Sequence, residues 1–594
     1  MKEMKRYRTL ALFLCMLLIF SLAVSCTKKE DNAPPSTVES SVKSDIKEPE
    51  EDVKPVSSEV PEEKPEPQKN GEVYVLFTSD VHCGIDSGFG YDGLFQIKKT
   101  LESSGYTVIL VDDGDAVQGE PIGMLTEGES IIELMNEVGY DVAIPGNHEF
   151  DYGIARFMEL ADKAEFRYLS CNFNREGELV FDPYTVVDAA GTKIGFVGVT
   201  TPTTLTTSTP AIFQDEKGKY IYSFMNDMTG EPVYKAVQEA VDKAREDGAE
   251  YVYLIGHMGM SAGDVPWTYA DVIQNTTGID VFLDGHTHDT EQAVVKNREG
   301  KDVVRSGCGT KLQAIGYSHI VPGEGIKDTD IWTWNNPVSF MKLAGISNVV
   351  TEKIDVEKKE LEAILGEKIA ETTIDLTIFD PVEKDEKGSP IRMVRRAETN
   401  AGDICADAFR YVTGADIGMT NGGGVRADIK KGDITYGDIL KVMPFNNQVA
   451  LVEATGQQIL DALEFGSKDI PSECGGFLQV SGLSYEVDVS IPSGCRFDEN
   501  GMMTEIVGER RVRNVMVGDE PLDPKKTYTV GGSNYILVLN GDGCTAFNDA
   551  KVISERVRPD SQALIRYIQE ALGGKVGKEY EDPYGQGRIK IITK

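Results

Sequence analysis

Beyond its first 26 residues, the sequence has no hydrophobic run of the ~20 residues that a membrane-spanning helix needs. Its nine cysteines include no Cys-x-x-Cys pair, which excludes a zinc ribbon and a thioredoxin-type redox motif. Positive charge is also scarce, because 60 Lys and Arg stand against 97 Asp and Glu and the formal net charge is −37. Such an acidic chain repels phosphate backbones, so no nucleic-acid polymer is expected as a partner.

The N-terminus has the features of an export signal. Basic residues between Lys2 and Arg8 precede an apolar stretch, Leu10 to Val24, that is too short to span a membrane. The stretch ends in Leu-Ala-Val-Ser-Cys26, which resembles the bacterial lipobox, although Ala23 stands where Leu is commoner. We therefore predict a lipoprotein signal peptide at residues 1–26 and a lipid anchor on Cys26. The alternative is an ordinary secretory signal in which this cysteine has no role.

Residues 27–69 are rich in Pro, Glu, Lys and Ser and have almost no large apolar side chains. Such a segment cannot bury enough surface to offset the entropy lost on ordering. We expect a disordered tether that holds the folded part away from the membrane.

From residue 70 onward, short apolar runs of β-rich composition alternate with helical patterns. The runs are Val73–Thr78, Thr107–Val111, Lys193–Val199, Tyr251–Ile255 and Val281–Leu283, with helical patterns at Ser130–Val138 and Val233–Glu246. The length of 594 residues exceeds one ordinary domain. The alternation predicts a layered α/β domain at 70–346, and a charged amphipathic helix at 347–368 is expected to lead to a second α+β domain at 369–594.

Polar residues suited to metal ions follow these runs. They are Asp80 and His82, Gly114-Asp115, Gly146-Asn147-His148-Glu149-Phe150-Asp151, His257, and Gly285-His286-Thr287-His288. Ligands of open α/β sheets gather at the carboxyl ends of strands, and residues i and i+2 of a strand point the same way. These side chains are therefore expected to converge on one site.

Histidine is rare, and its distribution strengthens this prediction. The chain has six histidines, and only His319 falls outside these motifs. A single histidine is more often a structural residue, but five of six beside Asp and Asn favour a metal site. Mixed oxygen and nitrogen ligands suit Zn, Mn or Fe better than Ca, and the lack of a thiolate set argues against a structural zinc.

Asp115 is the natural carboxylate to bridge two ions, with Asp113 as its nearest competitor. Two metals ~3.5–4 Å apart can share a hydroxide and hold a phosphoryl group for in-line attack. Such a site also neutralises a phosphate substrate that the acidic surface would repel.

In this order, the five motifs resemble those of the calcineurin-type metallophosphoesterases. The folded part, roughly residues 70 to 594, resembles the bacterial 5′-nucleotidase, UDP-sugar hydrolase and 2′,3′-cyclic nucleotide phosphodiesterase family. The resemblance implies a four-layer-type β-sandwich metallophosphoesterase domain flanked by helices at 70–346. It also implies a linking helix at 347–368 and a nucleotide-binding α+β domain at 369–594.

Site roles carry over from the family by position. One divalent ion is expected on Asp80, His82, Asp115 and His288, and the other on Asp115, Asn147, His257 and His286. His148 resembles the family's catalytic histidine, and Asp151 resembles the carboxylate that orients it and keeps it protonated. The implied nucleophile is a metal-activated water. Cys83 stands where Gly is commoner and is read as structural.

The second domain has its own set of matching residues. Arg395 occupies the position of a phosphate-contacting arginine, and Asn421-Gly-Gly-Gly-Val-Arg426 resembles a nucleotide-contacting loop. A triple glycine lets the backbone approach a ligand, and an arginine can contact phosphate with two nitrogens. The alternative is a tight turn with a surface arginine.

Two aromatic residues are expected to stack on the base. Phe445 matches the first position and Tyr535 is the choice for the second, although the spacing to Asp542 is one residue longer than usual and leaves Ile536 open. Asp542 is expected to accept hydrogen bonds from the sugar hydroxyls. Stacking contributes ~1–3 kcal/mol per base with little sequence preference. The alternative is that both aromatic side chains belong to the core.

The resulting hypothesis is an extracytoplasmic, membrane-anchored 5′-nucleotidase with two divalent metal ions, Zn, Mn or similar, acting on nucleoside monophosphates. The alternatives are a 2′,3′-cyclic nucleotide phosphodiesterase, a UDP-sugar hydrolase, or a nucleotide-binding lipoprotein, which would need neither the metals nor His148. The arginine and aromatic set argues against a thiosulfohydrolase. The sequence leaves open the preferred base, the native metals, the oligomeric state and any pairing of Cys474 with Cys495.

Overall fold

The computed structural model describes residues 71–215, 217–335, 347–384 and 388–593. The predicted signal peptide, Cys26 and the predicted tether at 27–69 lie outside these ranges. Among the helices in these ranges, none combines the length and the apolar character needed to cross a membrane.

Two six-stranded sheets form the N-terminal half, residues 71–335. The first sheet has the order β15-β14-β1-β2-β3-β4, in which β1 to β4 run parallel, β14 is antiparallel to β1, and β15 is antiparallel to β14. Its strands are β1 Val73–Thr78, β2 Thr107–Asp112, β3 Val142–Ala143, β4 Arg167–Tyr168, β14 Ala314–Val321 and β15 Gly325–Thr333.

The second sheet has the order β12-β13-β11-β10-β8-β7, with four parallel central strands and an antiparallel strand at each edge. Its strands are β7 Tyr184–Ala189, β8 Thr192–Thr200, β10 Tyr251–His257, β11 Val281–Asp284, β12 Thr290–Lys296 and β13 Asp302–Cys308. A small sheet accompanies them, formed by β5 Asn174–Arg175, β6 Glu178–Leu179 and β9 Tyr222–Ser223.

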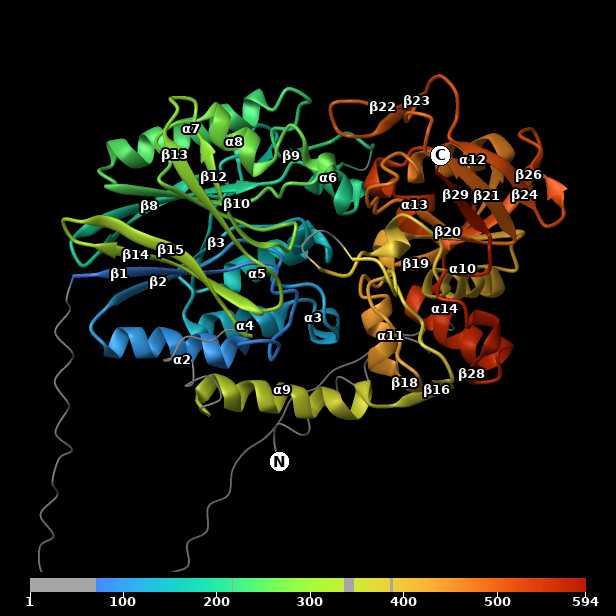
Figure 1. Ribbon diagram of the computed structural model, residues 1–594, viewed down its shortest axis with the longest axis horizontal. Coiled ribbons are helices and arrows are strands. Elements are labelled where there is room, and N and C mark those ends of the chain that lie inside the picture. Colours follow the sequence, from blue (N-terminus) through green and yellow to red (C-terminus); the bar gives the residue numbers. More distant parts are fainter. Residues whose placement is uncertain (1–70, 216, 336–346, 385–387, 594) are drawn as a thin grey trace, which may run out of the picture. The chain divides into compact units, whose positions relative to one another are not determined.

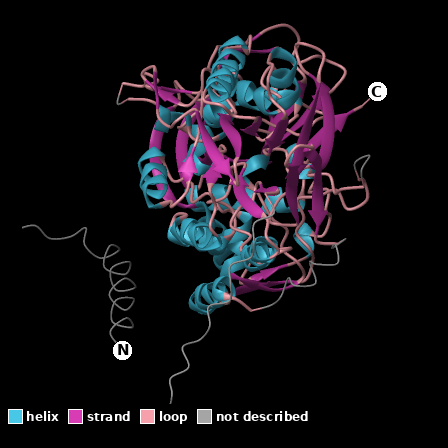
Figure 2. Cartoon of the chain, turned by 90° about the vertical axis from the view of Figure 1, so that its left-hand side faces the viewer, coloured by secondary structure: helices cyan, strands magenta, loops and turns pink. Residues whose placement is uncertain are grey.

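The alternation of side chains along the strands explains the layers. Val75 and Phe77 of β1 pack with Phe196 of β8 in a core shared by the two sheets. Leu76 of the same strand points the other way, into the core under the helices α2, α4 and α5. Helices α7 and α8 cover the outer face of the second sheet. In Figure 1 these two helices lie above the strands and α2 and α4 lie below them, and Figure 2 gives a side view of the chain. This helix–sheet–sheet–helix order confirms the predicted four-layer sandwich.

The helices of this half form where apolar residues recur at helical spacing, and a glycine can end such a helix. In α4, Ile131, Met135 and Val138 fall on one buried face, and the helix ends where Gly139 takes the left-handed conformation at φ +79°. The helices are α2 Gly90–Ser103, α3 Pro121–Thr126, α4 Glu129–Val138, α5 Ile154–Lys163, α6 Thr204–Thr207, α7 Glu231–Glu246 and α8 Tyr269–Asn275.

Helix α9, Val349–Leu365, falls within the predicted linking segment 347–368. It begins at Asn348, whose side chain accepts hydrogen bonds from the backbone amides of Val350 and Thr351. Val350 and Ile354 are buried in the core beneath the first sheet, so the helix packs on the N-terminal half.

The C-terminal half, residues 369–593, centres on a five-stranded sheet with the order β20-β17-β26-β19-β27. One face packs on α10 and α14, and the other packs on α12 and a four-stranded sheet ordered β25-β24-β21-β29. The larger sheet consists of β17 Ile417–Asn421, β19 Gln448–Thr455, β20 Leu478–Ser481, β26 Thr527–Ser533 and β27 Lys551–Pro559. The smaller one consists of β21 Leu483–Asp488, β24 Val512–Val517, β25 Glu520–Pro521 and β29 Ile589–Ile592.

The remaining strands form a three-stranded sheet and a hairpin. They are β16 Lys368–Thr372, β18 Gly432–Thr435 and β28 Lys575–Val576 in the sheet, and β22 Cys495–Phe497 and β23 Met503–Ile506 in the hairpin. The helices are α10 Asn400–Thr413, α11 Tyr436–Val442, α12 Gly456–Gly466, α13 Asn534–Leu537 and α14 Asp560–Arg566.

Candidate functional site

The predicted metal ligands follow the carboxyl ends of parallel strands from both sheets of the N-terminal half. β1 and β2 run parallel in one sheet, and β10 and β11 run parallel in the other. The backbone is left-handed at five of the seven predicted ligands: Asp80 (φ +51°), His82 (+45°), Asp115 (+60°), His286 (+84°) and His288 (+58°). Such conformations are costly for residues other than glycine, and they gather at functional sites.

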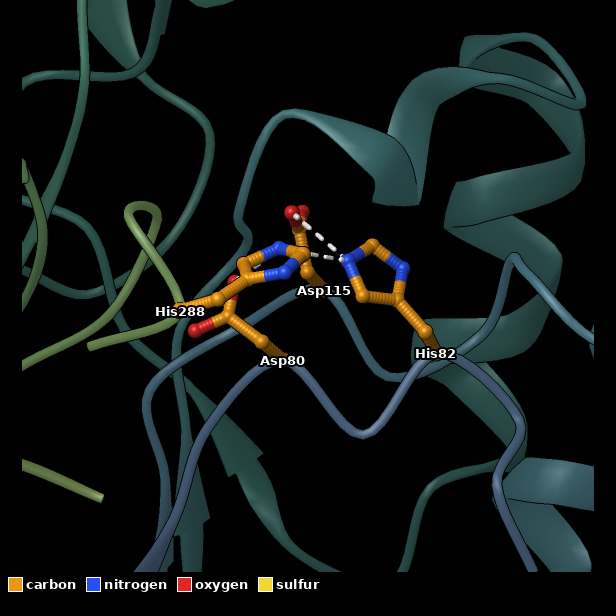
Figure 3. Close-up of side chains that lie close together, drawn as sticks. All are labelled: Asp80, His82, Asp115 and His288. Carbon is orange, nitrogen blue, oxygen red and sulfur yellow. Dashed lines mark hydrogen bonds and ion pairs between the residues drawn. The ribbon is translucent and has the colours of Figure 1, made fainter. Parts of the chain in front are cut away.

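Four predicted ligands meet at one point. A side-chain nitrogen or oxygen atom from each of Asp80, His82, Asp115 and His288 lies within 4.8 Å of the other three, and the four side chains point toward one another in Figure 3. The Nε2 atoms of His82 and His288 are 3.1 Å apart. Asp80 Oδ1 lies 3.4 Å from His288 Nε2. The structure therefore brings together the set predicted for one ion.

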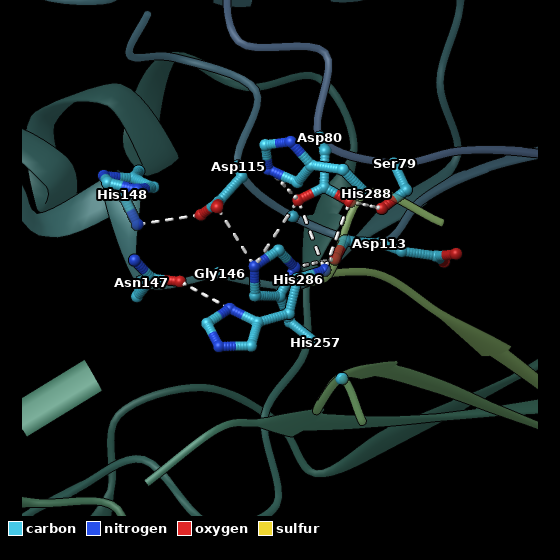
Figure 4. Close-up of polar contacts among 12 residues, drawn as sticks. Ser79, Asp80, Asp113, Asp115, Gly146, Asn147, His148, His257, His286 and His288 are labelled. Atoms are coloured by element: carbon cyan, nitrogen blue, oxygen red, sulfur yellow. Dashed lines mark hydrogen bonds and ion pairs between the residues drawn. The ribbon is translucent and has the colours of Figure 1, made fainter. Parts of the chain in front are cut away.

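The ligands predicted for the second ion adjoin this cluster. His257 Nε2 lies 3.0 Å from Asp115 Oδ2, and Asn147 Oδ1 lies 3.0 Å from His286 Nδ1. Asp115 thus contacts members of both sets, as a bridging carboxylate must. In Figure 4 the carboxylate of Asp113 points away from the group, which favours Asp115 over Asp113.

The donor atoms suit a divalent metal. His257 donates from Nδ1 to the Asp113 carbonyl oxygen at 2.7 Å, and His82 donates from Nδ1 to the Gln118 carbonyl oxygen at 2.8 Å. Both Nε2 atoms therefore face the cluster. Nε2 of His257 is fully buried and, despite the nearby Asp115, makes no hydrogen bond of acceptable geometry. A ring held through one nitrogen and presenting the other is the usual arrangement of a metal-bound histidine.

The electrostatics of the cluster point the same way. Burial raises the pKa of Asp80 to about 7 and lowers the pKa of His82 to about 3. Burial would also lower the pKa of His257, but the carboxylates of Asp115 and Asp80 raise it well above its usual value. These buried carboxylates require a compensating positive charge, which divalent ions would supply.

His148 and Asp151 form the predicted pair beside this cluster. Their Nδ1 and Oδ2 atoms are 2.6 Å apart, and the His148 amide donates to Asp115 Oδ1 at 2.8 Å. Burial acts to lower the pKa of His148, but the Asp151 and Asp115 carboxylates outweigh it and raise the pKa above its usual value. The higher pKa favours the protonated imidazole, which can donate a proton.

Two supporting carboxylates were not recognised from the sequence. Glu149 accepts from the backbone amides of Gly146 (2.7 Å), Asp115 (2.8 Å) and Ala116 (2.8 Å), and its place in the Gly-Asn-His-Glu motif was the available signal. Asp264 places Oδ1 3.3 Å from His286 Nε2. It ends a short 3-10 helix, Ala262–Asp264, that has no recognisable pattern, so the sequence carried no signal for it.

A cleft of about 1000 Å³ adjoins the predicted metal ligands and is lined by residues of both halves. On one side it reaches Asp115, Asn147, His148, Asp151, His286 and His288. On the other side it reaches all six predicted substrate residues, Arg395, Asn421, Arg426, Phe445, Tyr535 and Asp542. The structure therefore places all six predicted substrate residues, the predicted pair His148 and Asp151, and four of the seven predicted metal ligands on one cavity.

Cations gather on the C-terminal side of this cleft. Burial, together with Arg392 and Arg426, holds the pKa of Arg395 well below its usual value. Burial, together with Arg392, lowers the pKa of Arg426 to about 10. Arg392 and Lys468 also line the cleft, and sequence analysis did not identify either. Crowded cations favour an anionic ligand such as phosphate.

The predicted aromatic positions are both at the cleft. The Phe445 ring stacks on His148 with a centroid distance of 5.7 Å, and Arg426 lies 5.6 Å from the same ring. Tyr535 lines the cleft, whereas Ile536 is buried in the core, so the geometry favours Tyr535. The Tyr535 hydroxyl lies 3.0 Å from the Thr206 carbonyl oxygen and accepts from the Asp542 amide at 3.0 Å.

Asp542 and Asn421 complete the substrate side. Oδ2 of Asp542 is buried without a hydrogen-bond partner, so it is available to a ligand hydroxyl. The Asn421 side chain donates to the Gly475 carbonyl oxygen at 3.3 Å. Cys474 and Cys495 line the same cleft and both carry free thiols, so the pairing left open by the sequence is not made in this structure.

Comparison with known proteins agrees with this geometry. Residues 73–290 match the calcineurin-like phosphoesterase model, and residues 374–549 match the 5′-nucleotidase C-terminal domain model. The chain is 28% identical over 579 residues to the trifunctional nucleotide phosphoesterase protein YfkN of Bacillus subtilis, covering 89% of this chain and 36% of YfkN. The chain thus spans little more than a third of that relative.

Other relatives match over nearly their whole length. The 5′-nucleotidase of Vibrio cholerae is 26% identical over 547 residues, which cover 84% of this chain and 93% of that protein. The crystal structure of a 5′-nucleotidase precursor from Thermus thermophilus superposes with a TM-score of 0.70 at 26% identity, covering 88% of this chain and all of that chain. The chain belongs to the metallophosphoesterase hydrolases in which a calcineurin-like phosphoesterase domain is joined to a 5′-nucleotidase C-terminal domain.

Proposed function

We propose that the protein is an extracytoplasmic 5′-nucleotidase that hydrolyses nucleoside monophosphates to nucleoside and phosphate. The observation that carries this proposal is the single cleft that has Asp115 and His148 on one wall and Arg395, Arg426 and Asp542 on the other. Relatives named 5′-nucleotidase and nucleotide phosphoesterase support it.

In this proposal two divalent ions occupy the N-terminal wall. Asp80, His82, Asp115 and His288 hold one ion, and Asp115, Asn147, His257 and His286 hold the other. Bound there, the ions supply an activated water and neutralise charge on the phosphate. Both zinc and manganese suit this mixed nitrogen and oxygen donor set.

The side chains around the ions have separate tasks. His148, held by Asp151, donates a hydrogen bond or a proton to the phosphoryl oxygens or the leaving oxygen as the bond breaks. Arg395 and Arg426 hold the phosphate, and Asn421 contacts the nucleotide. Phe445 and Tyr535 stack on the base, and Asp542 accepts hydrogen bonds from the sugar hydroxyls.

We also propose the division into a signal peptide at 1–26, a tether at 27–69, a metallophosphoesterase domain at 70–346, a linking helix at 347–368 and a nucleotide-binding domain at 369–594. A lipid on Cys26 anchors the chain to a membrane. A Cys26→Ala chain is then expected to be absent from the membrane fraction of expressing cells. Its retention in that fraction would contradict the proposed lipid anchor.

The function is tested by phosphate release from AMP. The chain is loaded with Mn²⁺ or Zn²⁺ and assayed beside His148→Ala. Loss of a positioned acid is expected to lower kcat roughly a hundredfold or more. His319→Ala is the matched control, since His319 pairs with Glu72 at 2.7 Å on strand β14, outside the cleft lining. It is expected to keep full activity.

UDP-sugars and 2′,3′-cyclic nucleotides are the second candidate substrates. A cleft of about 1000 Å³ leaves room for a UDP-sugar, which is larger than a nucleoside monophosphate. A 2′,3′-cyclic nucleotide is no larger than AMP and is tested beside it because it presents the same groups to the cleft. Turnover of these compounds without release from AMP would replace the 5′-nucleotidase proposal. Tight nucleotide binding by the metal-loaded chain without turnover of any of them would overturn the assignment of a substrate altogether.

A further inference from the structure

Arg305 is the largest fully buried side chain of the described residues, with 1% of its surface exposed. It lies on β13, opposite Phe282 of β11 on one side and Ala293 of β12 on the other. The loop from Gly285 to Asp289 connects β11 to β12 and carries His286 and His288. Arg305 therefore stands on the strand between the two ends of this loop.

The guanidinium group contacts both ends of the loop. Nε and Nη2 donate to Asp284 Oδ2 at 3.1 and 2.9 Å. Nη2 also donates to Asp289 Oδ1 at 3.0 Å, and Nη1 donates to Asp289 Oδ2. The face of the group packs over the Tyr269 ring at 4.6 Å. The planar guanidinium group thus links Asp284, which precedes the loop, to Asp289, which ends it. Lysine cannot reproduce this geometry.

Gly307 leaves the space that this arrangement needs. A Cβ atom at Gly307 would lie 2.7 Å from Arg305 Nη1 and 3.0 Å from Cζ. Because residues i and i+2 of a strand share a face, only a glycine here lets the guanidinium lie along β13 toward the loop.

The loop requires such restraint. His286 and His288 both have left-handed backbones, with φ of +84° and +58°. Residues other than glycine keep this conformation only when their surroundings hold them in it. The other carboxylate oxygen of Asp284 accepts from the Met258 amide at 2.8 Å, which extends the restraint to the residue directly after His257.

We propose that Arg305 is a positioning residue that fixes three of the metal-binding histidines through Asp284 and Asp289. His286 and His288 are held by the two ends of their loop, and His257 is held through the Asp284–Met258 hydrogen bond. The inference rests on the proposed function only in taking these histidines as metal ligands. It does not depend on which phosphate ester is the substrate.

The test measures metal binding without any substrate. The full-length chain is stripped of metal and titrated with Mn²⁺ by calorimetry, as wild type, as Arg305→Lys and as Asp289→Asn. Removing the partners that orient a ligand typically weakens metal binding by about 10–100-fold. We expect at least tenfold weaker Mn²⁺ binding in Arg305→Lys and a smaller loss in Asp289→Asn, which keeps the contacts between Arg305 and Asp284. The Asp289→Asn variant still tests the inference if Arg305→Lys fails to fold.

Arg588→Lys is the matched control. Arg588 is also largely buried and paired, with Nη2 2.8 Å from Asp407 Oδ2, but it belongs to the C-terminal half. It is expected to lower the thermal midpoint and leave Mn²⁺ affinity within about twofold of wild type. Wild-type affinity in both Arg305→Lys and Asp289→Asn would overturn the inference, as would an equal loss in Arg588→Lys. A wild-type chain that binds Mn²⁺ but releases no phosphate from AMP would contradict the proposed function alone.

Discussion

The two walls of the cleft are built in different ways. On the N-terminal wall, the functional side chains come in short motifs after strands, on strained backbones, and many contact one another directly. On the C-terminal wall they come singly from separated segments, such as Arg395 at the end of a 3-10 turn, Asn421 at the end of β17 and Tyr535 in α13. The first wall is one linked cluster, whereas the second is assembled from separated segments that meet only in pairs, such as Tyr535 with Asp542 and Arg426 with Phe445.

This difference matches two kinds of task. Metal coordination and proton donation depend on positions fixed within a few tenths of an ångström, which strained loops and shared hydrogen bonds provide. Holding a base, a sugar and a phosphate divides into separate contacts, each of which adds affinity. We therefore expect substitutions on the N-terminal wall to lower turnover of every substrate. Substitutions on the C-terminal wall should affect only substrates that carry the contacted group.

The largest effect is expected for Asp115→Asn. This change weakens the carboxylate that contacts both ligand sets, and the loss of several kcal/mol of charge stabilisation corresponds to a rate loss on the order of a thousandfold. Phosphate release should fall equally for AMP and for p-nitrophenyl phosphate, and elemental analysis should find less than the full metal content.

Asp113→Asn is the neighbouring control. Both carboxylate oxygens of Asp113 are buried without a hydrogen-bond partner, and burial raises its pKa well above the usual value, so the site favours an uncharged side chain of this size. Metal content and activity should stay near wild type. Equal losses in Asp113→Asn and Asp115→Asn would contradict the bridging role.

An intermediate effect is expected for Asp151→Asn. Without this carboxylate, burial acts with less opposition and the pKa of His148 falls. If protonated His148 is required, the alkaline limb of the kcat profile moves to lower pH, with a loss of roughly a hundredfold at neutral pH. The pH profile for AMP measures both quantities. An unmoved alkaline limb would mean that Asp151 acts in some way other than by holding the proton on His148.

The smallest effect is expected for Asp542→Asn, on the C-terminal wall. Loss of one charge-assisted hydrogen bond costs about 1.5–3 kcal/mol, or roughly a 10–150-fold rise in KM for AMP. The kinetics of p-nitrophenyl phosphate, which has no sugar, should be unchanged. An equal change in KM for both substrates would contradict the proposed difference between the two walls.

The same contrast explains what could be predicted from the sequence. The runs at Val73–Thr78 and Tyr251–Ile255 are strands in the structure, because their apolar residues face a sheet on one side and helices on the other. The predicted metal ligands fall in compact motifs, and the structure brings four of them to one point. Arg305 was not found, because only the pairing of β11, β12 and β13 brings it to Asp284 and Asp289. Asp264 was not found, because it contacts His286 from a separate segment that follows β10.

The C-terminal wall was predicted through family resemblance rather than through local pattern. Nothing near Phe445 indicates that its ring stacks on His148, almost 300 residues earlier in the chain. Arg392 and Lys468 likewise gave no signal, since a lone cation in sequence is usually a surface residue. Their role depends on tertiary packing alone.

Glu149 has a consequence for how the site responds to movement. Its single carboxylate receives amides from the loop that carries Asp115 and from the loop that carries His148. Displacement of one loop therefore pulls the other with it, and the spacing between the bridging carboxylate and the imidazole survives motions that shift both. A substitution at Glu149 would remove this coupling. The distance between Asp115 and His148 would then vary more, although every predicted ligand residue would still be present.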